Sequence, residues 1–189
     1  MRIIAGTFRS RSLAAPAGLS TRPTSDRLRE TLFNVLTPRI RGAAFLDLYA
    51  GSGAVGMEAL SRGAKSVTFV ERAPVALAVL RGNLAKLGIT TGFRIQPGGV
   101  GAYLRRGAAG EKTAAAFDLV FLDPPYDAAQ EYETTLGLLG TKGPLAAGAV
   151  VIAEHRRKEK LEESYGGLKR TRLLEQGDAS LSFYAVGAE

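Results

Sequence analysis

The tetrapeptide Asp123-Pro124-Pro125-Tyr126 has residue types that suit holding a flat aromatic amine while its nitrogen attacks an electrophile. An exocyclic amine on a nucleobase is a poor nucleophile because its lone pair is delocalised into the ring. A carboxylate and a neighbouring main-chain carbonyl can each accept a hydrogen bond from one amine hydrogen, which favours a pyramidal nitrogen. The two prolines stiffen the turn, and Tyr126 can stack on the base. We predict that these four residues form a catalytic loop.

A glycine-rich turn lies upstream of this tetrapeptide. It follows an apolar run at residues 44–49 and opens a helix-spaced segment at residues 54–62. Glu71 lies 20 residues after Gly51, which is the spacing expected of an acid that binds ribose hydroxyls. Asp47, inside the apolar run, is placed to orient the turn and the amino-acid part of a ligand. The predicted cofactor-binding residues are Asp47, Gly51, Ser52, Gly53, Glu71 and Arg72.

The glycine pattern occurs in sites for both NAD and S-adenosylmethionine, so it does not by itself choose between them. Three features favour the methyl donor. Asp47 lies within the first strand, and S-adenosylmethionine has a ribose that Glu71 could bind but no pyrophosphate. The amine-holding tetrapeptide also comes at a later strand end. An NAD-linked oxidoreductase would need a hydride-handling site, and no His or Lys suggests one. A non-catalytic RNA-binding protein, and an amino-methyltransferase acting on another RNA or DNA base, stay open as alternatives.

The two motifs together resemble those of the class I amino-methyltransferases. The N-terminal sequence narrows the resemblance to the bacterial small-subunit (16S) ribosomal RNA guanine-N2 methyltransferases, the RsmD family. The stretches that carry it are Arg2-Ile3-Ile4-Ala5-Gly6, the segments 22–30 and 33–36, and Glu58-Ala59-Leu60-Ser61-Arg62-Gly63-Ala64. The chain departs from the family's pattern at Gln96-Pro97-Gly98, where relatives have an acid that contacts the donor's adenine.

The resemblance runs from Arg2 almost to the end of the chain, and it carries several implications. It implies S-adenosylmethionine as the methyl donor and the N2 amine of a guanine in small-subunit ribosomal RNA as the acceptor. It further implies a cytoplasmic enzyme that works on a small-subunit particle, without a membrane or a metal.

Alternating strand and helix patterns predict an α/β protein with the Rossmann-like class I methyltransferase fold. We expect a mostly parallel seven-stranded sheet with helices on both faces, one antiparallel strand near the C-terminus, and an N-terminal hairpin and helix. The predicted strands are 44–49, 66–70, 92–96, 117–122, 149–154, 168–174 and 180–186. The predicted helices are 26–36 (ended by Pro38), 54–62, 74–87, 99–106, 128–140 and 156–162. We place a basic N-terminal extension at residues 1–41 and the methyltransferase domain at residues 42–189.

The positive charge is unevenly distributed. The chain of 189 residues has a net charge of +7, and residues 1–41 carry eight arginines against two acids. Residues 155–175 carry a further surplus of three positive charges. A cluster of arginines is typical of a protein that binds a polyanion. The predicted RNA-binding residues are Arg2, Arg9, Arg11, Arg22 and Arg27.

The remaining composition excludes several classes of protein. The absence of cysteine excludes a disulfide scaffold and thiolate metal sites, and it favours the cytoplasm. No apolar stretch approaches the length of a membrane span. The single histidine, His155, and the scattered acids predict no metal site, and we expect His155 to be solvated at a strand end.

Overall fold

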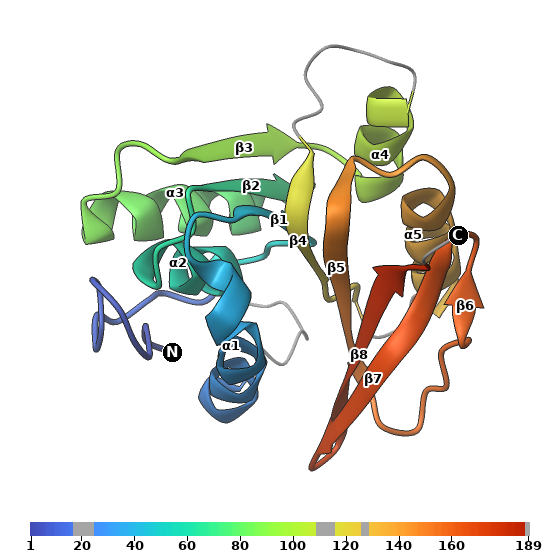
Figure 1. Cartoon of the computed structure of the whole chain (residues 1–189). Helices are drawn as coiled ribbons and strands as arrows, with labels where there is room; N and C mark the ends of the chain where they lie inside the picture. Colours follow the sequence, from blue (N-terminus) through green and yellow to red (C-terminus); the bar gives the residue numbers. More distant parts are fainter. Residues whose placement is uncertain (17–24, 109–115, 126–128, 188–189) are drawn as a thin grey trace.

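The computed structural model describes residues 1–16, 25–108, 116–125 and 129–187, and Figure 1 shows the arrangement. The predicted catalytic Tyr126 and the predicted RNA-binding Arg22 lie outside the described residues. The strands are β1 (Ala44–Leu48), β2 (Ser66–Glu71), β3 (Phe93–Pro97), β4 (Phe117–Leu122), β5 (Leu145–Arg156), β6 (Ser164–Tyr165), β7 (Leu168–Gln176) and β8 (Ala179–Val186). The helices are α1 (Asp26–Ile40), α2 (Ala54–Ser61), α3 (Pro74–Leu87), α4 (Val100–Ala108) and α5 (Ala129–Lys142).

One sheet of eight described strands forms the centre of the molecule, in the order β3-β2-β1-β4-β5-β8-β7-β6. The first five strands in this order are parallel, and β8 pairs antiparallel with β5. The predicted Rossmann-like fold, with its antiparallel strand near the C-terminus, is therefore confirmed. Our count of seven strands is one too low, because the two-residue β6 adds a further antiparallel pair at the edge.

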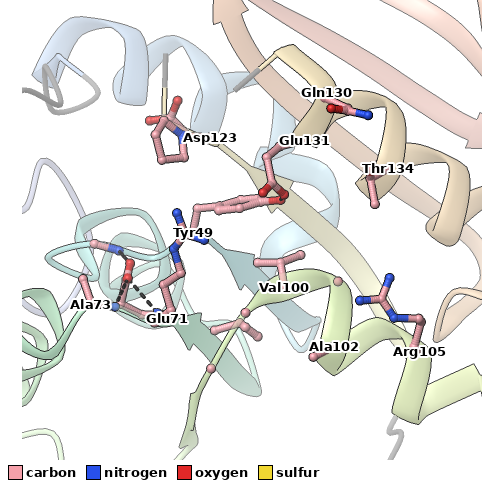
Figure 2. Close-up of a pocket in the computed structure, with 17 residues that line it drawn as sticks. Tyr49, Glu71, Ala73, Val100, Ala102, Arg105, Asp123, Gln130, Glu131 and Thr134 are labelled. Atoms are coloured by element: carbon pink, nitrogen blue, oxygen red, sulfur yellow. Dashed lines mark hydrogen bonds between the residues drawn. The ribbon is translucent and has the colours of Figure 1, made fainter. Parts of the chain in front are cut away.

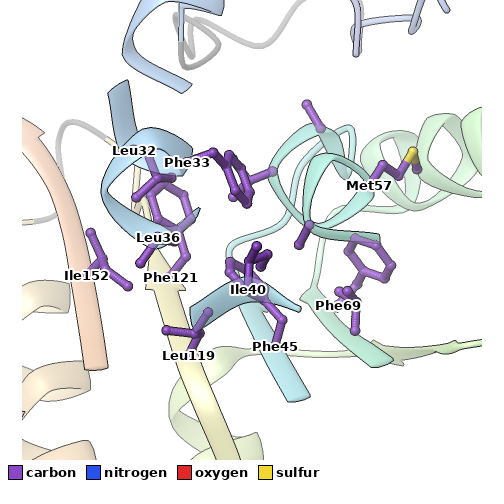
Figure 3. Close-up of a cluster of buried hydrophobic side chains, with 14 of the residues drawn as sticks. Leu32, Phe33, Leu36, Ile40, Phe45, Met57, Phe69, Leu119, Phe121 and Ile152 are labelled. Atoms are coloured by element: carbon purple, nitrogen blue, oxygen red, sulfur yellow. The ribbon is translucent and has the colours of Figure 1, made fainter. Parts of the chain in front are cut away.

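Helices cover both faces of the sheet. On one face, α1, α2 and α3 bury a cluster that includes Phe33, Phe45 and Phe69, part of which is drawn in Figure 3. On the other face, α4 and α5 pack Leu104 and Leu136 against the sheet. Gly56 permits close packing of α2 on β2, since a Cβ atom there would lie 2.3 Å from the Phe69 ring.

The N-terminal segment packs into the same core as the sheet. Ile3 and Leu13 are buried in the cluster that contains Phe45. The expected hairpin is present, with a single antiparallel bridge between Arg2 and Ser12. The boundary between the extension and the domain at residues 41 and 42 stays a prediction.

The carboxylate of Glu58 forms hydrogen bonds that attach the N-terminal hairpin to α2. Its two oxygens accept hydrogen bonds from the amides of Ile4 at 2.7 Å and Ala5 at 3.0 Å. The same fully buried carboxylate lies 2.7 Å from Nε of Arg62 and 3.8 Å from Nε of Arg29. The hairpin is thus held by a buried ionic cluster as well as by apolar contacts.

Two predicted helix assignments are wrong. Pro38 does not end the first helix, because α1 continues through it to Ile40, whose side chain is buried in the core. The predicted helix at 156–162 is absent: β5 extends to Arg156, which pairs with Ala179 of β8. The chain then turns, and the Arg157 amide donates to the Asp178 carbonyl at 2.8 Å. Pairing with β8 therefore overrides the helical pattern of this short charged stretch.

Candidate active site

A cavity of about 530 Å³ opens at the carboxyl ends of the parallel strands. Its lining includes Gly51 of the glycine turn, Glu71 and Arg72 after β2, and Asp123 and Pro125 after β4. These segments meet because β1 lies between β2 and β4, so that Leu48 is level with both Val70 and Leu122. Figure 2 shows Asp123 at one side of this cavity and Arg105 at the opposite side. The glycine turn and the proline-stiffened acid therefore face a single cavity.

The predicted catalytic loop is only partly within the described residues. Asp123 and Pro125 line the cavity, whereas Pro124 is buried behind them. Asp123 directly follows the last residue of β4, so the strand fixes its backbone position. The proposed roles of these residues stay predictions.

Glu71, the last residue of β2, holds the glycine turn that we predicted to bind the cofactor. One of its oxygens accepts a hydrogen bond from the Gly51 amide at 2.8 Å, and the other accepts from the amides of Arg72 and Ala73, each at 2.7 Å. Figure 2 shows these bonds as dashed lines. A carboxylate has about four lone-pair sites, so Glu71 keeps acceptor capacity toward the cavity. It therefore ties the β1–α2 and β2–α3 turns together while it faces the ligand space.

Three of the predicted cofactor residues, Asp47, Ser52 and Gly53, are not among the described residues that line the cavity. Asp47 is buried and accepts a hydrogen bond from the Gly56 amide at 2.9 Å. The Ser52 carbonyl accepts from Asn83, while Gly53 precedes α2 with φ of 79°. A Cβ atom at Gly53 would lie 2.8 Å from the Met57 methyl group. In this structure, these residues fix the conformation of the turn and the start of α2.

Tyr49 is a cavity residue that our sequence reasoning missed as a functional residue. Its backbone has φ of 61°, a left-handed conformation that is unusual for a bulky residue. Its hydroxyl lies 2.8 Å from Glu131 and 2.7 Å from Thr135 on α5. The side chain thus joins the strand before the glycine turn to the helix after the catalytic loop.

The segment after β3, where the resemblance implied an acid, forms a glycine-lined wall of the cavity. Gly98 and Gly99 line the cavity, and a Cβ atom at either position would meet nothing within 4 Å. The Gly98 amide donates to the Glu71 carbonyl at 2.9 Å. Arg105 of α4 also lines the cavity, and no motif in the sequence indicated it.

Carboxyl groups gather near the carboxyl ends of β1, β4 and β5. Burial raises the pKa of Asp123 well above its ordinary value, and the charges of Glu154 and Asp47 raise this pKa further. Burial likewise raises the pKa of Asp47 to about 8, although the Gly56 hydrogen bond opposes that shift. Burial thus favours the protonated form of the Asp123 and Asp47 carboxyls at this end of the sheet.

The predicted RNA-binding arginines that the structure describes contact different elements, although Arg2 and Arg11 belong to one hairpin in which Arg2 pairs with Ser12. Arg2 lies 3.9 Å from Asp26 in the first turn of α1, and Arg27 is exposed in the same turn. Arg9 and Arg11 lie at the far end of α2: the Thr7 amide donates to the Ser61 carbonyl, and Arg11 donates to the Lys86 carbonyl at 2.8 Å. Ser61 ends α2 and Lys86 lies in the last turn of α3, so both are distant from the glycine turn.

Three further observations concern metals, membranes and the single histidine. Within the described ranges, no group of three or more His, Cys, Asp or Glu side chains could hold a metal ion. None of the described helices is both long and apolar enough to cross a membrane. His155 is not solvated as expected: it is buried, and its Nε2 lies 2.9 Å from the Ser182 hydroxyl.

This parallel sheet, with a reversed strand inserted beside β5 and a cavity at the carboxyl ends of its strands, defines a Rossmann-like methyltransferase fold. A family model described as conserved hypothetical protein 95 matches residues 1–185. A protein of Bacillus subtilis provisionally named rRNA methyltransferase YlbH is 38% identical over 184 residues, which cover 97% of this chain and 98% of the relative.

Ribosomal RNA small subunit methyltransferase D of Escherichia coli is 38% identical over 154 residues, which cover 82% of this chain and 74% of the relative. A solved Escherichia coli structure, provisionally named methyltransferase yhhF, is 35% identical with a TM-score of 0.84 and covers 100% of this chain and 99% of its own. The chain belongs to the conserved hypothetical protein 95 family, the RsmD family of ribosomal RNA small subunit methyltransferase D. The resemblance inferred from the sequence is thereby confirmed.

Proposed function

We propose that this protein transfers a methyl group from S-adenosylmethionine to the exocyclic N2 amine of a guanine in small-subunit ribosomal RNA, in the cytoplasm and on a small-subunit particle. The observation that carries the proposal is the single cavity shared by the glycine turn and by Asp123 and Pro125. Family membership supports ribosomal RNA as the substrate, because the Escherichia coli relative is named for that activity.

The cavity fits the proposed donor. S-adenosylmethionine supplies an electrophilic methyl group on a sulfonium centre when it is bound. Glu71 is placed to accept from ribose hydroxyls, and it holds the Gly51 amide at the cavity wall. Gly98 and Gly99 leave space for a flat ring, with backbone groups in place of the acid that relatives carry.

Asp123 and the Pro124 carbonyl would hold the two hydrogens of the guanine amine. Two fixed acceptors keep the nitrogen pyramidal and aim its lone pair into the cavity. The base must leave its stack to reach this position, and Tyr126 is proposed to stack on it. After transfer, the surplus proton leaves the nitrogen through Asp123 or water.

Replacement of Asp123 tests this assignment. Asp123→Ala removes one amine acceptor, so we expect the single-turnover rate to fall about 10²-fold to 10³-fold. Donor affinity measured by calorimetry should stay nearly unchanged. Asp123→Asn keeps an acceptor oxygen, so substantial residual activity would assign the effect to hydrogen bonding and not to charge.

A matched control uses Asp118, an exposed acid on the same strand whose carboxylate accepts from the Ala44 amide at 2.8 Å. Asp118→Ala should retain the normal rate of transfer to unmodified small-subunit particles. Mass mapping of the nucleotide labelled by the wild-type protein identifies the acceptor. Normal turnover by Asp123→Ala would refute the amine-holding role.

A further inference from the structure

The antiparallel part of the sheet extends beyond the catalytic strand. The pairing of β4 with β5 ends at Leu122 and Ala153, whereas β5 continues three residues further, to Arg156. At about 3.3 Å per residue, the end of β5 lies roughly 10 Å past the end of β4. β8 begins and β7 ends at this level, since Ala179 pairs with both Arg156 and Gln176. Figure 1 shows the β7–β8 hairpin projecting past the end of β4, with α1 on the other side.

Basic side chains follow the end of β5 directly. The β5–β6 loop, residues 157–163, begins with Arg157, Lys158, Glu159 and Lys160. Arg157, Lys158 and Lys160 are all exposed. Arg157 forms an ion pair with Glu175 at 3.1 Å, whereas no carboxylate of the described residues pairs with Lys158 or Lys160. The acidic Glu163, at the other end of the loop, is paired with Arg170.

Leu161 holds this loop against the body of the protein. Its side chain is buried in the core on the α4 and α5 face. Its carbonyl accepts from Arg170 at 3.1 Å, and the Glu162 amide donates to the Tyr165 hydroxyl at 3.0 Å. The two lysines are therefore presented from an anchored turn.

We propose that Lys158 and Lys160 contact the phosphate backbone of the RNA substrate, on the flank of the active site opposite α1. The inference rests on the proposed function, which brings a polyanion to Asp123. The end of β5 neighbours Asp123 across the sheet, so an RNA strand whose base enters the cavity passes within reach of this loop. Exposed lysines without acidic partners provide phosphate contacts without reading the base sequence.

A double substitution, Lys158→Ala with Lys160→Ala, tests the contact. Each lost phosphate contact should flatten the dependence of log affinity on log salt by about 0.7 to 0.9. Binding to a small-subunit ribosomal RNA transcript should weaken by roughly one order of magnitude at physiological ionic strength. Donor affinity should not change, and Lys158→Arg with Lys160→Arg should restore the wild-type slope.

The matched control removes two exposed lysines at the opposite end of the sheet, by Lys142→Ala with Lys169→Ala. Lys142 ends α5, and Lys169 pairs with Ala185 near the start of β7. This control changes net charge equally and should leave the salt slope close to that of the wild type. The loop assignment is overturned by an unchanged slope in the Lys158 and Lys160 variant, or by an equal loss in the control.

The two proposals fail in different ways. Wild-type protein that binds the transcript with the expected salt slope but transfers no methyl group refutes the proposed function and supports the loop contact. Methyl transfer by the wild type, together with a normal slope in the double variant, refutes the loop contact and supports the proposed function.

Discussion

At the residue scale, Asp47 links the glycine turn to the pH dependence of stability. Burial raises its pKa from 3.8 to about 8, so the folded state binds this proton more tightly than the unfolded state does. The contribution of the protonated Asp47 carboxyl to the free energy of unfolding is complete below about pH 4 and is lost as pH rises through about 8. Asp47→Asn does not titrate and keeps an acceptor for the Gly56 amide. We expect its unfolding free energy to exceed that of the wild type increasingly as pH rises, by a few kcal/mol near pH 8. Urea unfolding across this range measures the difference, with the exposed Asp118→Asn as control. A constant difference between Asp47→Asn and wild type would contradict the assignment.

At the element scale, the attachment of the N-terminal hairpin to α2 depends on Glu58. This fully buried carboxylate holds two hairpin amides and lies beside Arg62 and Arg29. Glu58→Ala removes the acceptors and the acid partner of Arg62, and it leaves the buried Arg29 with Asp26 as its remaining acid, so we expect a loss of about 3 to 5 kcal/mol of stability. Thermal unfolding measures this loss, and limited proteolysis near Gly6 should become faster. Glu30→Ala removes an exposed acid from α1 and serves as the comparison. If both variants have equal stability, the hairpin does not depend on the buried cluster.

At the scale of the whole molecule, the N-terminal arginines are expected to contribute unequally to RNA binding. Arg27 is exposed in the first turn of α1, next to Arg2, and Met1 reaches Ser52 of the glycine turn. Arg9 and Arg11 lie at the far end of α2. Arg27→Ala should therefore lower kcat/KM for small-subunit particles about fivefold, as one phosphate contact predicts. Arg9→Ala should have a smaller effect, although both substitutions remove one positive charge. Steady-state rates at fixed ionic strength compare the two variants, and a larger loss from Arg9→Ala would place the RNA along the hairpin instead.

The sequence alone predicted the elements that depend on local patterns. Alternating strand and helix patterns predicted the parallel sheet and the strand ends after which the glycine turn and Asp123 come, and the structure shows that these two strands, β1 and β4, are neighbours. Asp123 could be found because it directly follows a buried strand, and Gly51 because it follows another by three residues; parallel strands bring their carboxyl ends to one edge. The family resemblance supplied the donor and the base, which no spacing in the chain specifies.

Only the tertiary structure decided how the site is held together. Tyr49 meets Glu131 and Thr135 across more than 80 positions of the chain, and Glu58 meets Ile4 across 54. The segment at 156–162 has a helical charge pattern, yet pairing with β8 draws its first residue into a strand. Arg11 shares the charge of Arg27 but contacts Lys86 in the last turn of α3, whereas Arg27 is exposed in the first turn of α1. Such features depend on contacts between segments that are distant in sequence, and a linear pattern of residue types does not contain them.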